Sequence, residues 1–145
     1  MYHRWAALAL VLALSCLAPE SAAGQSAQAD QLQPRGRKAG TLGQNYPNPV
    51  NSETHIPFSL ACVEGAGSDY VVSVRIYNVL AQLVAVPVLQ EGGEILENIT
   101  LPCGEYVGYW DGKVRRTGHD AASGTYIYEL VVDGERTAKK MFVGK

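Results

Sequence analysis

The stretch that decides the fold runs from residue 126 to residue 143 and reads YIYELVVDGERTAKKMFV. Every second residue from Tyr126 to Val132 is apolar, which places these side chains on one face of an extended strand. The Asp133-Gly134 pair that follows is typical of a tight hairpin turn, and residues 138–143 supply the returning strand. The stretch therefore predicts two antiparallel strands that share one apolar face.

The same alternation returns in shorter runs along the chain. Further strands are expected over residues 56–62, 72–77, 84–88, 95–101 and 106–110. Pro57 cannot donate to a ladder, so its strand should be an edge strand or have one open side, and Pro87 weakens its strand as a hairpin partner. Beyond the N-terminal segment, no window of about eleven residues has helical spacing. About seven short strands separated by turn signals indicate an all-β sandwich.

The N-terminus resembles an export signal over residues 1–23. The apolar run from Trp5 to Leu17 is too short to span a bilayer, and small residues before Ala23 suit cleavage after it; a buried N-terminal helix is the alternative. Residues 24–41 are polar, contain a single large aliphatic side chain, and predict a flexible linker. We therefore expect the folded domain to occupy residues 42–145.

The predicted state of the three cysteines depends on whether this export signal is removed. Cys16 lies inside it and leaves lipid attachment as an alternative to plain cleavage. After cleavage Cys62 and Cys103 remain, and an even count in an exported protein predicts a disulfide between them, with two buried free thiols as the alternative. Closing a loop of roughly 40 residues would stabilise the fold by about 3–4 kcal/mol in the chain-entropy model.

The charge balance excludes one class of partner. The chain has 12 Lys and Arg against 14 Asp and Glu, a net charge of −2. Nucleic-acid-binding domains usually carry a basic surplus on one face, so we expect no nucleic-acid partner.

Groups for catalysis are few. Once the signal is removed, His55 and His119 are the histidines that remain, and the sequence has no Cys/His metal spacing, no Gly-x-Ser-x-Gly and no phosphate loop. Asp111-Gly112 is interpreted as a hairpin corner, and calcium binding is an alternative that no Asp-x-Asp series supports. We expect no enzyme, no cofactor and no metal site.

A series of motifs in the predicted domain resembles a known family. In order along the chain, the motifs are LGQNYPNP (42–49), THIPF (54–58), VRIYNVL (74–80), WDG (110–112), ASGTYIYEL (122–130) and KKMFV (139–143). Together they resemble the C-terminal sorting domain of type IX secretion substrates and are similar to the immunoglobulin-like domain of flagellar hook-capping proteins. The resemblance covers residues 42–145. It implies an immunoglobulin-like β-sandwich of about seven antiparallel strands, which the outer-membrane secretion machinery recognises and often removes.

The chain departs from the family pattern at three points. Ala81 stands where the family usually has glycine, and a left-handed turn there would cost about 1–2 kcal/mol, so the turn type stays open. Val50 stands where an aromatic residue is frequent. The family's domain normally follows a large passenger, whereas here the expected signal and linker precede it, so a stand-alone domain, a remnant and a small surface protein stay open.

Two segments are candidates for receptor recognition. The first comprises Asn45, Pro47, Asn48 and Pro49, whose prolines stiffen the backbone; its alternative role is a rigid lead into the first strand, with Tyr46 packed on the sandwich. The second comprises Lys139, Lys140 and Lys145, whose alternative role is to keep the last strand from pairing with other chains. The structural landmarks are Trp110, Asp111, Gly112, Gly124 and Tyr126, and Trp110 is expected to be a core residue rather than a ligand platform.

The resemblance makes a non-catalytic module for export and cell-surface attachment the expected function. The expected location is the outer membrane, the cell surface or the extracellular space. The alternatives are a stand-alone extracellular binding or adhesion domain, with a cell-surface glycan or protein as its partner, and a structural subunit of a surface assembly.

Overall fold

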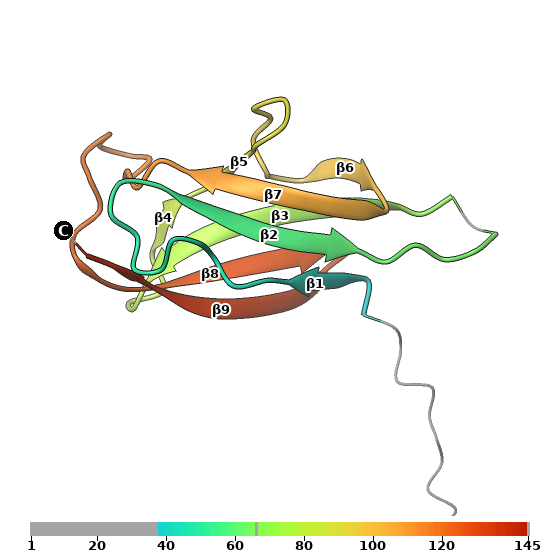
Figure 1. The fold of residues 1–145 in the computed structure, drawn as a ribbon, viewed down its shortest axis with the longest axis horizontal. Coiled ribbons are helices and arrows are strands. Elements are labelled where there is room, and N and C mark those ends of the chain that lie inside the picture. The colour runs from blue at the N-terminus through green and yellow to red at the C-terminus, as the bar shows by residue number, and fades with distance from the viewer. Residues whose placement is uncertain (1–37, 66, 145) are drawn as a thin grey trace, which may run out of the picture. The chain divides into compact units, whose positions relative to one another are not determined.

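Figure 1 shows the computed structural model of the chain, which describes residues 38–65 and 67–144. In this part of the chain two antiparallel sheets pack face to face and no residue is helical, so no helix there could cross a membrane. The predicted fold class, an all-β sandwich, is confirmed. The expected signal peptide over residues 1–23, with Cys16, most of the expected linker, and Lys145 lie outside the described residues.

Two sheets contain all nine strands of the described residues. Sheet A has the order β1 (Gly40–Leu42), β2 (Thr54–Leu60), β7 (Gly104–Trp110) and β5 (Val88–Leu89). Sheet B has the order β4 (Leu83–Ala85), β3 (Asp69–Asn78), β8 (Gly124–Val132) and β9 (Glu135–Val143), and β6 (Ile99–Pro102) pairs with the first part of β3. The count exceeds the expected seven for two reasons. Residues 84–88 belong to two strands, and β1, which begins before the expected start of the domain at residue 42, is an additional strand.

The core is the layer between the sheets. Its largest fully buried side chains include Tyr128, Ile56, Ile76, Leu96, Leu130 and Met141. Trp110 is 3% exposed, and its ring centroid lies 6.0 Å from that of Tyr126. The indole N–H of Trp110 donates to the carbonyl oxygen of Lys113 at 2.9 Å. Trp110 therefore packs in the core with its polar atom satisfied.

The prediction that residues 84–88 form one strand is wrong. β4 pairs with β3 in sheet B, whereas β5 pairs with β7 in sheet A. The chain crosses between the sheets at residues 86 and 87. Because Pro87 has no N–H to donate, a continuous ladder through this position would lack a bond, and the crossing falls there.

Two positions were expected for the strand containing Pro57, an edge or one open side; the edge position is wrong, and the open side is found at this residue. β2 lies between β1 and β7. The β1 ladder ends where Leu42 pairs with Phe58, and the next amide, that of Gly43, donates to the Pro57 carbonyl at 2.8 Å. Carbonyl and nitrogen of a strand residue face the same neighbour, so the missing N–H of Pro57 falls where the β1 ladder stops.

Two turn pairs behave differently from each other. Asp133-Gly134 forms the two-residue hairpin between β8 and β9, with φ angles of 48° and 87°. Asp111-Gly112 does not form a hairpin corner, because the chain continues from sheet A through a long connection to β8 in sheet B. Gly112 has φ of 70°, and a Cβ atom there would lie 2.5 Å from the Ser52 carbonyl oxygen, so this position requires glycine.

The turn between β3 and β4 keeps a left-handed residue without glycine. Ala81 has φ of 59°. The Asn78 side-chain oxygen accepts from the amides of Leu80 and Gln82, each at 3.0 Å. These bonds hold the turn on both sides of Ala81 and offset part of its backbone strain.

The disulfide predicted between Cys62 and Cys103 is confirmed, with Cα atoms 5.0 Å apart. Cys62 follows the end of β2, and Cys103 lies between β6 of sheet B and β7 of sheet A. The bond therefore fixes one end of the sandwich, where the chain passes from one sheet to the other.

Candidate functional site

The first segment predicted for recognition is held from inside the fold. Asn45 is 2% exposed, and its side-chain amide donates to Thr54 Oγ1 at 3.0 Å and to the Pro47 carbonyl at 3.2 Å. Thr54 Oγ1 also donates to the Pro47 carbonyl, at 3.0 Å. Asn45 therefore shapes the segment and is not available to a receptor, whereas Pro47, Asn48 and Pro49 are exposed.

Tyr128 anchors the start of this segment, a role that the sequence did not indicate. Its hydroxyl accepts from the Asn45 amide at 3.0 Å and donates to the Gly43 carbonyl at 2.8 Å. Burial raises the pKa of the Tyr128 hydroxyl, and the hydrogen bond from Asn45 opposes part of that rise. The only signal in the sequence was the alternation that placed Tyr128 on the core face of its strand.

The same segment pairs with the last strand. Asn48 Oδ1 accepts from the Phe142 amide at 3.0 Å, and the Val50 amide donates to the Phe142 carbonyl at 2.7 Å. The Gly144 amide donates to the Val50 carbonyl at 2.9 Å, and the side-chain amide of Gln44 to the Lys140 carbonyl at 3.3 Å. We call residues 44–50 together with residues 140–144 the C-terminal edge; Figure 1 shows this loop beside β9.

The two lysines of the second predicted segment are separated by the pleat of β9. Lys139 pairs with Tyr128, whose side chain faces the core, and Lys139 itself is half-buried. Lys140 pairs with Ile127 and is exposed on the outer face. Lys140 therefore belongs to the exposed side of the C-terminal edge and Lys139 does not. Phe142, which is 52% exposed, lies on the outer face with Lys140 and was not among the predicted recognition residues.

The remaining landmarks serve the end of the sandwich near Trp110. Asp111 Oδ1 accepts from the Lys113 amide at 3.1 Å, and the Ala121 amide donates to the Gly112 carbonyl at 2.8 Å. Gly124 opens β8 with φ of 154°. The hydroxyl of Tyr126 donates to the Ala122 carbonyl at 2.8 Å. These contacts organise the long connection between β7 and β8.

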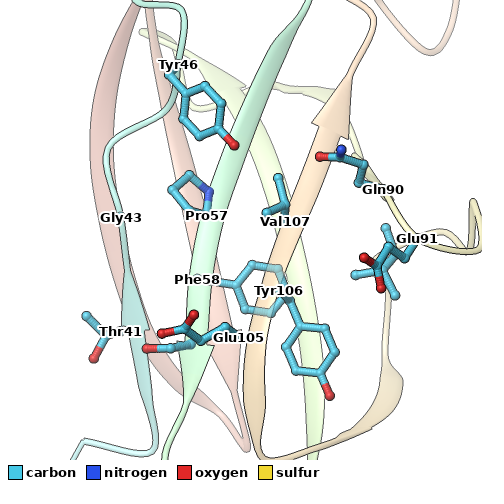
Figure 2. Close-up of a pocket in the computed structure, with 12 residues that line it drawn as sticks. Thr41, Gly43, Tyr46, Pro57, Phe58, Gln90, Glu91, Glu105, Tyr106 and Val107 are labelled. Atoms are coloured by element: carbon cyan, nitrogen blue, oxygen red, sulfur yellow. The ribbon is translucent and has the colours of Figure 1, made fainter.

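A second candidate surface lies on the outer face of sheet A, where a groove of about 480 Å³ crosses the strands (Figure 2). Its lining residues are Thr41, Gly43, Tyr46, Pro57, Phe58, Ser59, Leu89, Gln90, Glu91, Glu105, Tyr106 and Val107. The expectation that Tyr46 packs on the sandwich holds only in part, because its ring stacks on that of His55 at 5.2 Å but remains 52% exposed.

The chemistry of the outer face of sheet A is aromatic and acidic. His55 lies between Tyr46 and Tyr109, 5.7 Å from the Tyr109 ring, and its Nδ1 lies 3.2 Å from Gln90 Oε1. The Tyr109 hydroxyl donates to Glu53 Oε2 at 2.7 Å. This hydrogen bond is the main reason why the pKa of Tyr109 is raised. Within residues 38–65 and 67–144, no three His, Cys, Asp or Glu side chains gather closely enough to hold a metal.

No protein-family model and no curated protein matches the chain. Among solved structures, the chain is similar to dimeric latent PorU from Porphyromonas gingivalis, with 25% identity and a TM-score of 0.50 over 74% of this chain and 10% of that one. It is also similar to the alkylpurine DNA glycosylase AlkC of Pseudomonas fluorescens, bound to DNA containing an abasic site analog, with 14% identity and a TM-score of 0.45 over 74% of this chain and 31% of that one. The second likeness is too low to carry an argument. The first covers only about a tenth of the PorU chain.

Proposed function

We propose that this domain is a non-catalytic sorting module that directs export and cell-surface attachment through a type IX secretion system. Its partner in this proposal is the outer-membrane secretion machinery, and its location is the outer membrane, the cell surface or the extracellular space. The observation that carries the proposal is the C-terminal edge, because it joins segments from both regions that the family resemblance marks for recognition. The likeness to part of PorU is consistent with a connection to type IX secretion.

The C-terminal edge has the properties of a recognition surface. It presents a cation at Lys140, an aromatic ring at Phe142 and the exposed pair Asn48-Pro49. Aromatic and cationic side chains often dominate binding energy at interfaces. The backbone around them is already fixed by hydrogen bonds to the segment 44–50, so a partner would find a preorganised surface and lose little conformational entropy on binding.

A reporter fusion tests the proposal. Residues 38–145 are placed behind an exported reporter in a host that carries type IX machinery, and surface reporter is measured by protease accessibility on intact cells. The wild-type fusion should reach the surface. Lys140→Glu combined with Phe142→Ala should leave the reporter in the periplasm, because both side chains are exposed and the backbone bonds of β9 remain.

The matched control reverses a charge and removes an exposed apolar group elsewhere. Arg116→Glu combined with Val71→Ala changes exposed residues outside the C-terminal edge and should leave surface delivery as in the wild type. A wild-type fusion that stays in the periplasm contradicts the sorting role. Equal delivery by both double variants contradicts the assignment of the C-terminal edge.

The second candidate function is a stand-alone extracellular binding or adhesion module. The groove on the outer face of sheet A favours it, because its lining includes the aromatic residues Tyr46, Phe58 and Tyr106 and no residue of the C-terminal strand. Its test is retention of the intact domain on mature cells together with a ligand that binds the groove.

A further inference from the structure

The outer face of sheet A carries side chains in rows that cross its strands. The outermost row begins with Tyr46, bridged to His55, continues through Tyr109, and ends at Val88. Successive ring centroids in this row are 5.2 and 5.7 Å apart. The three rings form an aromatic stripe beside the groove, and Tyr46 is the member of the stripe that lines it.

The rest of the groove changes from apolar to polar. Beside the stripe, Pro57 and Val107 pair across β2 and β7 and form an apolar floor, as Figure 2 shows. The next row consists of Thr41, Ser59 and Glu105, which the registers of β1, β2 and β7 bring together. Gln90 and Glu91 stand on the far side of the floor from Tyr46 (Figure 2).

We propose that this groove binds a neutral oligosaccharide. A sugar ring offers apolar C–H faces that stack on aromatic rings, and a rim of hydroxyls that donate to carboxylates and to amide oxygens. In the groove, the Tyr46 ring lies on one side of the apolar floor and Gln90 and Glu91 lie on the other. The groove's lining residues include two carboxylates, Glu91 and Glu105, and neither lysine nor arginine, so an anionic polymer would be repelled.

The backbone of the groove favours a sugar over an extended peptide. The floor is the face of a sheet, and the carbonyl groups of its residues Pro57 and Val107 already accept from the amides of Gly43 and Gln90. A peptide that gains affinity by adding a strand needs a free edge, which this floor does not offer. Charge alone would also suit a basic peptide, and the test below includes one.

The polar and aromatic groups of the groove are held in place before a ligand arrives. The backbone of Tyr46 exchanges two hydrogen bonds with His55, at 2.9 and 2.8 Å. The His55 ring in turn contacts Gln90 Oε1 at 3.2 Å. A preorganised site loses less conformational entropy on binding. The inference does not rest on the sorting role, because the groove lies on sheet A and the C-terminal edge on β9.

The test titrates the purified secreted protein with neutral hexasaccharides (maltohexaose, cellohexaose and mannohexaose) to millimolar concentration and follows backbone amide shifts by NMR. At least one should shift the amides of Gln90 and Val107 saturably. Tyr46→Ala should weaken that binding about tenfold, because it removes the ring and leaves the backbone bonds in place. Tyr77→Ala, which removes a ring from the outer face of sheet B, should leave it unchanged.

A second variant separates a sugar from a basic peptide. Glu105→Gln keeps a hydrogen-bond acceptor but removes the charge, so hexasaccharide affinity should change less than about threefold. Three results would overturn the proposal: no hexasaccharide shifts the groove, Tyr46→Ala binds as the wild type does, or hexalysine binds more tightly than every saccharide and weakens in Glu105→Gln. Sorting of the reporter fusion is a separate measurement, so either proposal can fail alone.

Discussion

Replacing Tyr128 with phenylalanine should detach the segment that forms half of the C-terminal edge. The change removes one oxygen atom and preserves the packed ring, which is fully buried. It leaves the buried Asn45 amide without its acceptor, which costs about 1–3 kcal/mol, and the half-buried Gly43 carbonyl without its donor, which costs less because water reaches it. We expect a total loss of about 2–3 kcal/mol, and a fall in Tm on the order of 10–20 °C.

Tyr126→Phe is the matched control, because the two tyrosines lie two residues apart on the same face of β8. The Tyr126 hydroxyl makes one bond, to the carbonyl of the exposed residue Ala122, so its loss should cost about 0.5–1 kcal/mol. Unfolding in guanidinium can be followed by the fluorescence of Trp110, which is 3% exposed. Hydrogen exchange at the Phe142 amide should accelerate only in Tyr128→Phe. Equal losses in the two variants would refute the anchoring role of Tyr128.

The raised pKa of Tyr128 adds a pH test with a definite sign. The folded state holds the phenolic proton more tightly than the unfolded chain, so this contribution to stability is complete below the unfolded pKa of about 10 and is lost as pH rises through the folded pKa. The stability difference between wild type and Tyr128→Phe should therefore shrink above about pH 10. Tyr109, whose pKa is also raised, titrates in both proteins and cancels from the comparison. A difference that stays constant to high pH would contradict the assigned burial.

Three further substitutions test single features of the fold. Ala81→Gly should raise stability by about 0.5–1 kcal/mol, since it relieves a left-handed alanine at φ 59° but makes the unfolded chain more flexible; calorimetry would show a higher Tm, and a lower one would contradict the strain. Gly112→Ala should cost at least about 2 kcal/mol, measured by guanidinium unfolding, because its Cβ would lie 2.5 Å from a carbonyl oxygen at φ 70°; an unchanged midpoint would show that the turn adapts. Replacing Cys62 and Cys103 by serine should cost about 4 kcal/mol for a separation of 41 residues, and a reductant should then have no further effect.

Local pattern was sufficient for most of the strands and for the disulfide. In β2 and β8, buried and less buried residues alternate, so each of these strands carries its own signal. The disulfide followed from an even cysteine count in a chain that the sequence predicts to be exported. Strands β1 and β5 have three and two residues, too few for a period to show, and they exist because longer neighbours pair with them. Leu96 is fully buried although it lies in no strand, and no periodicity could indicate that.

The groove shows a different limit of sequence reasoning. Tyr46, His55 and Tyr109 lie in three separate elements and form a stripe only through the register of those elements. A shift of one residue in β2 would turn His55 to the core and divide the stripe, because side chains in a strand alternate between faces. The separation of Lys139 from Lys140 could have been predicted, since neighbours in any strand point to opposite faces.

The C-terminal edge explains why Asn45 is buried whereas Asn48, in the same predicted segment, is exposed. β9 is the last strand of sheet B, and an uncovered edge strand is a template for pairing with other chains. Asn48 and Val50 occupy the hydrogen-bonding groups of Phe142 on that edge, and they can do so only because Asn45 turns inward to hold the loop. A partner therefore cannot add a strand at Phe142 without displacing this loop. Recognition at the C-terminal edge should then act through exposed side chains such as Lys140, which is why the side-chain variants, rather than truncations of β9, are the decisive test of sorting.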